Sequence, residues 1–391
     1  MSRYQSFSIH AFVERCSRIL TAVLTTVTAA ALPLTLLGVG TVGTVLYRLS
    51  ALSARTMIPS SVIEGGSDMA RVSPSDAAGV SSGAVPSQAE EPVQVSGSRD
   101  EEPAAGTADE KNAAQAEEPD SDKGRVKEKQ LPDTGVSYGN VYVRDGNSHY
   151  DVDIPQALNS AAKCRIRRNA GYQVLLVHTH TTESYADSDR SWYSKKVNPR
   201  TTDKSESVVA VADEIARKLN KAGIKTLHIT TYHDYPEYTG AYKRARQTIQ
   251  KYLREYPSIE MVIDVHRDAM KLDDGTKIKP TVTIDGKKAA QVMIITGCDN
   301  DGKLSFDGWR DNLVMAVQLQ KQLADDHPGL ARPLYFAPFR YNMDLTPNSL
   351  LVEFGTDVNT LSEACYAGRM VGDSLVKLLC RYEVKKTESG D

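Results

Sequence analysis

The sequence predicts an α/β fold in which helices flank a mostly parallel β-sheet. Short, unbroken apolar runs such as 174–177 and 261–265 have the length and composition of strands buried on both faces. Segments with helical spacing of apolar residues alternate with these runs, as in a layered βαβ fold. The alternation begins after about residue 136, so we expect one folded domain over 136–385 and a short tail at 386–391.

The N-terminal region contains a predicted transmembrane anchor. Residues 19–47 include no Asp, Glu, Lys or Arg, and this stretch exceeds the roughly 20 residues that a helix needs to cross a bilayer. A cleaved signal peptide is the alternative, with small residues at 52–54, but its apolar core would have only about 7–15 residues. Three arginines precede the stretch and two follow it, which favours a cytoplasmic N-terminus at 1–18. We expect a single-pass protein of the cell membrane with its C-terminal domain outside.

Residues 48–135 are predicted to form a disordered tether. They are rich in Ser, Ala, Gly, Pro and acidic residues and contain few large apolar side chains. Such a segment buries too little surface to offset the entropy lost on ordering, and its charges extend it. The tether would let a folded domain reach far from the membrane.

The overall charge gives no reason to expect nucleic acid as a partner. The formal net charge is -3, and the Lys and Arg residues of the C-terminal half form no basic run. The five cysteines lie far apart without a CxxC motif, so neither a zinc knuckle nor a disulfide framework is indicated. We expect small, buried apolar residues at Cys16, Cys164, Cys298, Cys365 and Cys380.

Helices and strands alternate through the first half of the predicted domain. Regularly spaced apolar residues predict an amphipathic helix over 205–222, which Gly223 ends. A strand over 224–230 follows, and a second helix over 242–253 leads into the strand at 261–265.

A β-hairpin is expected to interrupt this alternation. Asp285-Gly286 is a favoured two-residue turn, and strand-like runs at 281–284 and 291–295 flank it. The remaining predicted elements are a helix at 309–324, strands at 333–338 and 350–354, and a final helix with apolar residues from 361 to 378 that Asn359 caps.

Three of the predicted strands end in side chains that can bind a metal ion. The residues concerned are His178, His180 and Glu183 after the first strand, His266, Arg267 and Asp268 at the second, and Glu353 at the third. Ligands of open α/β sheets bind beyond the carboxyl ends of the strands, so we expect these three ends to share one crevice.

Two histidines and one glutamate form a known ligand set of catalytic zinc. Such a site keeps a fourth position for water, whose pKa falls to about 7. We expect His180 and His266 as ligands together with Glu183 or Glu206. We prefer Glu183, because the helix macrodipole alone favours an acid such as Glu206 in a first turn. Four other histidines lie outside the strand ends and are expected to be structural: His149, His228, His233 and His327.

Glu353 is the candidate for proton transfer. Hydrolysis of an amide needs a carboxylate, not bound to the metal, that orients the water and passes a proton to the leaving amine. The alternative for Glu353 is a structural ion pair with a cation such as Arg267.

Four separated segments resemble the stage II sporulation protein P family of endospore-forming bacteria. They are HTHTTESY, IDVHRDA, YNMDL and LLVEFGTDVNTLSEA, and the resemblance covers about 173–379. That family is similar to the zinc-dependent N-acetylmuramoyl-L-alanine amidases. The similarity implies an amidase-like fold in which His180 and His266 bind Zn²⁺ and Glu353 is the catalytic carboxylate.

A departure from the amidase pattern leaves two assignments open. The amidases carry a Gly-His-Gly-Gly turn where this chain has His178-Thr-His180-Thr, so His178 is either a ligand or a catalytic helper. The glutamate ligand of the amidases opens the helix after the first strand, which favours Glu206 over Glu183.

The resemblance also implies a function. It implies a membrane-anchored peptidoglycan hydrolase that acts on the septal wall during engulfment in sporulation, with stage II sporulation proteins D and M as partners. The expected cleavage is at the bond between N-acetylmuramic acid and L-alanine, with added endopeptidase activity on stem peptides. Arg267 would hold a substrate carboxylate or stabilise the oxyanion. The alternatives are a peptidoglycan-binding or scaffolding module with an inactive amidase-like site, and a different zinc peptidase on a similar fold.

Overall fold

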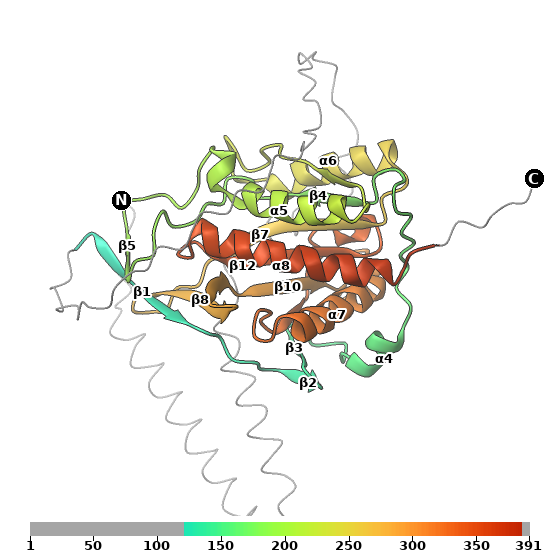
Figure 1. Ribbon diagram of the computed structural model, residues 1–391, viewed down its shortest axis with the longest axis horizontal. Coiled ribbons are helices and arrows are strands. Elements are labelled where there is room, and N and C mark those ends of the chain that lie inside the picture. The colour runs from blue at the N-terminus through green and yellow to red at the C-terminus, as the bar shows by residue number, and fades with distance from the viewer. Residues whose placement is uncertain (1–120, 385–391) are drawn as a thin grey trace, which may run out of the picture. The chain divides into compact units, whose positions relative to one another are not determined.

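An eight-stranded mixed sheet forms the centre of the part of the chain that the structure describes, residues 121–384. Figure 1 shows this computed structural model. Across the sheet the strands are β2 (Val136–Tyr138), β3 (Val141–Asp145), β11 (Leu334–Ala337), β10 (Val292–Gly297), β12 (Ser349–Thr356), β7 (Met261–Asp268), β4 (Val174–Val177) and β6 (Thr226–His228).

Most neighbouring strands of this sheet are parallel. β12, β7, β4 and β6 run in one direction, while β10 is antiparallel to β12 and continues in parallel to β11 and β3. The predicted mixed α/β architecture is therefore confirmed. The shared direction of β4, β7 and β12 brings the residues that follow them to one edge of the sheet.

A second, four-stranded sheet has the order β5 (Trp192–Ser194), β1 (Lys123–Lys129), β8 (Lys277–Ile284) and β9 (Lys287–Ala290). The hairpin turn at Asp285-Gly286 is present, and β8 pairs with β9 across it. The strand predicted at 291–295 is present from Val292 on as the start of β10, but its predicted pairing with 281–284 was wrong. β9 takes that place, and β10 lies in the large sheet, where its apolar side chains are fully buried.

The predicted boundary of the tether at residue 135 was also wrong. β1 lies within that segment and pairs in parallel with β8, with Val126 opposite Lys277. Its sequence, KGRVKEK, has one large apolar residue and therefore resembles linker. Backbone hydrogen bonds hold it in place, together with polar contacts such as that of Glu128 Oε1 with Thr281 Oγ1 at 2.9 Å.

The predicted anchor at 19–47 and most of the tether lie outside the described residues, as does Cys16. Between residues 121 and 384, no helix combines the length and the apolar character needed to cross a membrane. The other four cysteines are free thiols; Cys164 and Cys298 are buried, and Cys365 and Cys380 are partly buried.

Between residues 121 and 384, five helices and two short 3₁₀ turns accompany the sheets. They are α4 (Ile154–Asn159), η4 (Lys204–Glu206), α5 (Val208–Lys221), α6 (Ala241–Glu255), α7 (Trp309–Asp326), η5 (Met343–Leu345) and α8 (Leu361–Cys380). Figure 1 shows α5 and α8 packed side by side in front of the large sheet.

The final helix is capped by Thr360 and not by the predicted Asn359. Thr360 Oγ1 accepts a hydrogen bond from Glu363 N, and the Glu363 carboxylate accepts one from Thr360 N, which completes a capping box. Asn359 instead uses its Oδ1 to accept from Thr356 N at 2.9 Å. This contact fixes the turn between β12 and α8.

The two faces of the large sheet pack against different helices. Val265 of β7 belongs to the larger core, which includes residues of α5 and α8. Val262 belongs to a smaller core with Ile249 of α6. Side chains alternate along a strand, so Asp264 and His266 share the face of Val262. The polar end of β7 therefore lies on the α6 side of the sheet.

Candidate metal centre

The strand ends predicted to carry chemistry lie next to one another. Glu353 of β12 is in register with His266 of β7, and Val177 at the end of β4 is in register with Asp264. The polypeptide after β4 turns back over this edge and carries His180 and Glu183. All of these polar side chains are buried.

His180 and His266 are close enough to share an ion. Their ring centroids are 5.3 Å apart and their planes are nearly perpendicular, at 86°. With Zn–N bonds of about 2.0–2.1 Å, two imidazoles on one tetrahedral ion have centroids roughly 5 Å apart. The separation in this structure is therefore compatible with joint coordination.

Glu183 is the glutamate that the structure brings to the histidines. Its Oε2 lies 3.5 Å from His266 Nδ1 and accepts a hydrogen bond from Arg267 N at 3.0 Å. Arg200 Nη2 lies 3.8 Å from the other carboxylate oxygen. Glu206 is exposed in η4. The geometry thus favours Glu183 over Glu206 as the carboxylate ligand.

Asp264, which the sequence analysis missed, orients His266. Its Oδ1 lies 2.9 Å from His266 Nε2, and the carboxylate also accepts from Thr179 N at 2.8 Å and Thr179 Oγ1 at 2.5 Å. Burial opposes the charged form of His266, but Asp264, Glu183 and Glu353 outweigh it and raise the pKa of His266 to about 9. The signal was present in the sequence, because Asp264 is two residues before His266 and so shares its face.

Tyr238 covers His180 from the loop before α6. The two rings are stacked with centroids 4.7 Å apart, and Tyr238 Oη lies 3.1 Å from His180 Nε2. The Arg200 guanidinium also lies over the Tyr238 ring, 4.7 Å from its centroid. Burial lowers the pKa of His180 well below its ordinary value. Nothing in the sequence pattern of this loop indicated such a contact.

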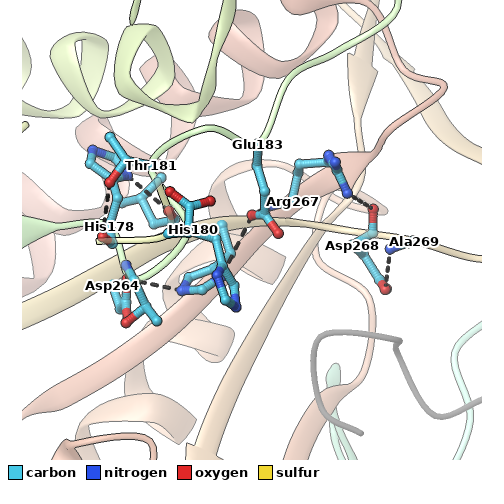
Figure 2. A network of polar contacts seen from close by, with 12 residues as sticks. His178, His180, Thr181, Glu183, Asp264, Arg267, Asp268 and Ala269 are labelled. Atoms are coloured by element: carbon cyan, nitrogen blue, oxygen red, sulfur yellow. Dashed lines mark hydrogen bonds and ion pairs between the residues drawn. The ribbon is translucent and has the colours of Figure 1, made fainter. Parts of the chain in front are cut away.

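Figure 2 shows how the side chains converge. In this view Glu183 and Arg267 lie on one side of His180, and Asp264 and His178 lie on the other. Dashed lines mark a contact of Asp264 and one of Glu183, which are the contacts with His266 given above.

Both ring nitrogens of His178 contact groups other than His180 and His266. Its Nδ1 donates to Val265 O at 2.9 Å, so its Nε2 accepts from His228 Nε2 at 2.8 Å. His228 Nδ1 lies 2.8 Å from Asp213 Oδ1 at the surface. Burial, with the neighbouring His228, lowers the pKa of His178 to about 3. Both nitrogens of His178 are thus occupied, which favours the role of helper over that of ligand.

Arg267 holds the chain around the site. Its guanidinium is buried and donates to three backbone carbonyls, those of Ser184 at 2.9 Å, Pro199 at 2.7 Å and Asp268 at 3.4 Å. These contacts join the residues after Glu183 to β7. The predicted role of Arg267 toward substrate remains a prediction, and the contacts favour a positioning role.

The residues present fit a divalent metal ion. His180 Nδ1 is buried and has no hydrogen-bond partner among the described residues, while His266 Nδ1 faces Glu183 Oε2. The second nitrogen of each ring has its own contact, with Tyr238 and with Asp264, as is usual for metal-binding histidines. Within residues 121–384, however, no three His, Cys, Asp or Glu side chains have the close spacing of a metal site. Coordination would require the donors to move closer together.

Comparisons with known proteins give the following matches. A family model described as stage II sporulation protein P (SpoIIP) matches residues 69–375. The stage II sporulation protein P of Bacillus subtilis (strain 168) is 27% identical over 238 residues, which are 56% of this chain and 54% of the relative. The chain thus matches about half the length of that curated relative.

Several solved structures are also similar. N-acetylmuramoyl-L-alanine amidase AmiC2 of Nostoc punctiforme is 10% identical, with 55% of this chain and 98% of that chain covered and a TM-score of 0.32. The amidase of Clostridium difficile 630 is 12% identical, with 55% and 97% covered and a TM-score of 0.32. A metallo-carboxypeptidase from Burkholderia cenocepacia is 7% identical, with 55% and 58% covered and the same TM-score of 0.32.

Proposed function

The chain belongs to the stage II sporulation protein P family, and we propose that its folded domain is a zinc-dependent hydrolase of peptidoglycan that acts in sporulation. One observation carries the proposal. Two buried imidazoles and a carboxylate, from His180, His266 and Glu183, face one another beside a second carboxylate, Glu353, that is in register with His266. A metal-bound hydrolase needs this combination of ligands and a separate proton carrier.

The finer parts of the proposal rest on the family and the sequence. The bond cleaved is the amide between N-acetylmuramic acid and L-alanine, and stem peptides are the second substrate. Residues 19–47 anchor the chain in the cell membrane with the domain facing the wall, and stage II sporulation proteins D and M are its partners. The uncharged stretch at 19–47 supports the anchor.

Each side chain of the site has a proposed task. His180, His266 and Glu183 hold the metal, which when bound supplies a Lewis acid and a water of lowered pKa. Glu353 accepts the proton of the attacking water and delivers it to the nitrogen of the leaving amine. Asp264 and Tyr238 fix the two imidazole rings, and Arg267 fixes the backbone that carries Glu183.

The alternative function is a peptidoglycan-binding module with an inactive site. One observation favours it: the side chains of His180, His266 and Glu353 are at most 1% exposed, so a polymer reaches them only after neighbouring residues move. Such a module binds sacculi without releasing soluble fragments.

A digestion assay separates the two functions. Full-length protein in detergent micelles is mixed with purified sacculi, before and after treatment with 1,10-phenanthroline and again after zinc is restored. We expect soluble fragments only when zinc is present. Mass spectrometry of the products distinguishes new L-alanine amino termini, from amidase cleavage, from new termini within the stem peptides.

Two variants and a matched control test the assigned roles. Glu353→Gln is expected to keep bound zinc and lose digestion, whereas His180→Ala is expected to lose both. His149→Ala changes an exposed histidine outside the site and is expected to change neither. Undiminished digestion by Glu353→Gln contradicts the proton-transfer role, and sacculus binding without any digestion by the wild type supports the binding module.

A further inference from the structure

Two buried tyrosines line the metal centre on the α6 side of the sheet. Tyr242 is in the first turn of α6, and its ring meets that of His180 edge to face with centroids 5.7 Å apart. Tyr341 comes from the loop before η5, and its ring centroid is 6.1 Å from that of Tyr242. Each tyrosine is 3% exposed. The three rings therefore form a chain of contacts that begins at His180.

The hydroxyl groups of both tyrosines lack a hydrogen-bond partner. Tyr242 Oη and Tyr341 Oη are buried, and neither contacts a donor or acceptor among residues 121–384. A phenol that only filled space could be a phenylalanine, and a buried polar group without a partner destabilises the fold. Two such groups side by side at a candidate active site point to a partner that arrives with a ligand.

The backbone around Tyr341 is strained, and several contacts maintain it. Tyr341 and Asn342 have backbone φ angles of 47° and 58°, which residues other than glycine rarely adopt. Asn342 Nδ2 donates to Tyr242 O at 2.9 Å, and Arg246 of α6 pairs with both oxygens of Asp344 at 2.8 and 2.6 Å. These contacts tie the YNMDL segment to α6. Strain that persists in this way is typical of functional sites.

The chemistry of the two hydroxyl groups indicates what kind of ligand they bind. A phenol with its ordinary pKa of about 10 carries its proton at neutral pH, so each hydroxyl has a hydrogen to donate. The partner that each hydroxyl lacks is therefore an acceptor, and amide carbonyl oxygens are acceptors of this kind.

We propose that Tyr242 and Tyr341 bind carbonyl oxygens of the wall polymer, a proposal that rests on the proposed hydrolase function. Tyr242, which contacts His180, donates to the oxygen of the amide that is cleaved and stabilises the negative charge that develops there. Tyr341, one ring farther from His180, donates to a neighbouring carbonyl of the bound chain. Both keep their protons throughout, so no further reactant is needed.

Two phenylalanine variants of the full-length protein test the roles separately. Kinetics are measured on soluble, uncross-linked peptidoglycan strands, together with zinc content and thermal unfolding. Tyr242→Phe is expected to lower kcat by about 10²–10³-fold, as for the loss of one oxyanion donor. Tyr341→Phe is expected to raise KM about tenfold with kcat retained. Both variants keep their zinc, and their unfolding temperatures stay the same or rise because an unpaired buried hydroxyl is removed.

Tyr366→Phe is the matched control. Tyr366 Oη donates to Ile284 O at 3.2 Å, away from the metal centre, so this variant is expected to lose some stability and no activity. A Tyr242→Phe enzyme with wild-type kcat overturns the proposal, as does a lower unfolding temperature in both test variants, which would reveal a structural partner. If the wild type itself releases no fragments, the hydrolase function fails and this proposal fails with it; wild-type digestion with an unaffected Tyr242→Phe removes the tyrosine roles alone.

Discussion

Replacing Asp264 by Asn tests whether His266 is a metal ligand that Asp264 holds in place. The carboxylate lies 2.9 Å from His266 Nε2 and is fixed by two contacts with Thr179, so His266 has its other nitrogen, Nδ1, turned toward Glu183. Asn has the same shape and keeps an oxygen for Thr179 N, but it carries no charge. The variant therefore removes the negative charge and the acceptor of the Thr179 hydroxyl, and keeps the rest of the side chain.

The expected loss is in metal affinity. Removing a partner that orients a metal-binding histidine typically costs 10–100-fold in affinity, which is about 1.4–2.8 kcal/mol. Burial strengthens the contact, because both side chains are shielded from water. We therefore expect a value in the upper part of this range, with hydrolysis at saturating zinc reduced less than hydrolysis at limiting zinc.

Competition with a fluorescent zinc chelator measures the affinity of the full-length protein. Asp299→Asn serves as the control, since Asp299 is also buried and accepts from Leu304 N and Phe306 N in a loop away from the site. Equal zinc affinities for wild type and Asp264→Asn would refute the assignment of His266 as a ligand held by Asp264. An equal loss in both variants would point to a general effect of buried aspartates.

Three further predictions concern the fold. Lys279→Met leaves the buried Glu363, 2.7 Å from Lys279 Nζ, without its cation. We expect the free energy of unfolding, measured in urea, to fall by about 3 kcal/mol and to be largely restored in the double variant Lys279→Met/Glu363→Gln. An unchanged free energy of unfolding in Lys279→Met would contradict this expectation. Burial raises the pKa of Cys164 and of Cys298 to about 12. At pH 8 both thiols should therefore react with a disulfide reagent about a thousandfold more slowly than a free thiol, and in denaturant they should react at the rate of a free thiol. Burial lowers the pKa of His233, so the unfolded chain takes up a proton that the fold resists, and stability falls as pH drops below about 6.5. His178 and His180 contribute to the same slope, so His233→Gln should reduce the slope between pH 7 and 5 without abolishing it. An unchanged slope would assign it to the other groups.

The large sheet was predictable because its central strands have a distinctive sequence pattern. Val174–Val177 and Met261–Asp268 contain apolar runs that only a sheet covered on both faces can bury, and both formed strands. β1 was missed because its side chains are mostly polar and its pairing partner is about 150 residues away. Nothing local distinguishes such a strand from a charged linker.

The residues of the candidate site also divide into those that the sequence could predict and those that it could not. Residues at strand ends were predictable, since His180, His266 and Glu353 follow apolar runs whose direction the α/β pattern sets. Asp264 was within reach of the two-residue period of a strand. Tyr238 and Tyr242 were not, because they come from a loop and a helix start whose approach to His180 depends on how α6 packs on the sheet.

The parallel pairing of β1 with β8 determines how mechanical load would enter the domain. A pull directed along β1 loads its hydrogen bonds to β8 and β5 as a group, in shear, instead of opening them one after another. The ion pair between Lys279 of β8 and Glu363 links this strand to the start of α8. We therefore expect the domain to stay folded under tension that is applied along β1.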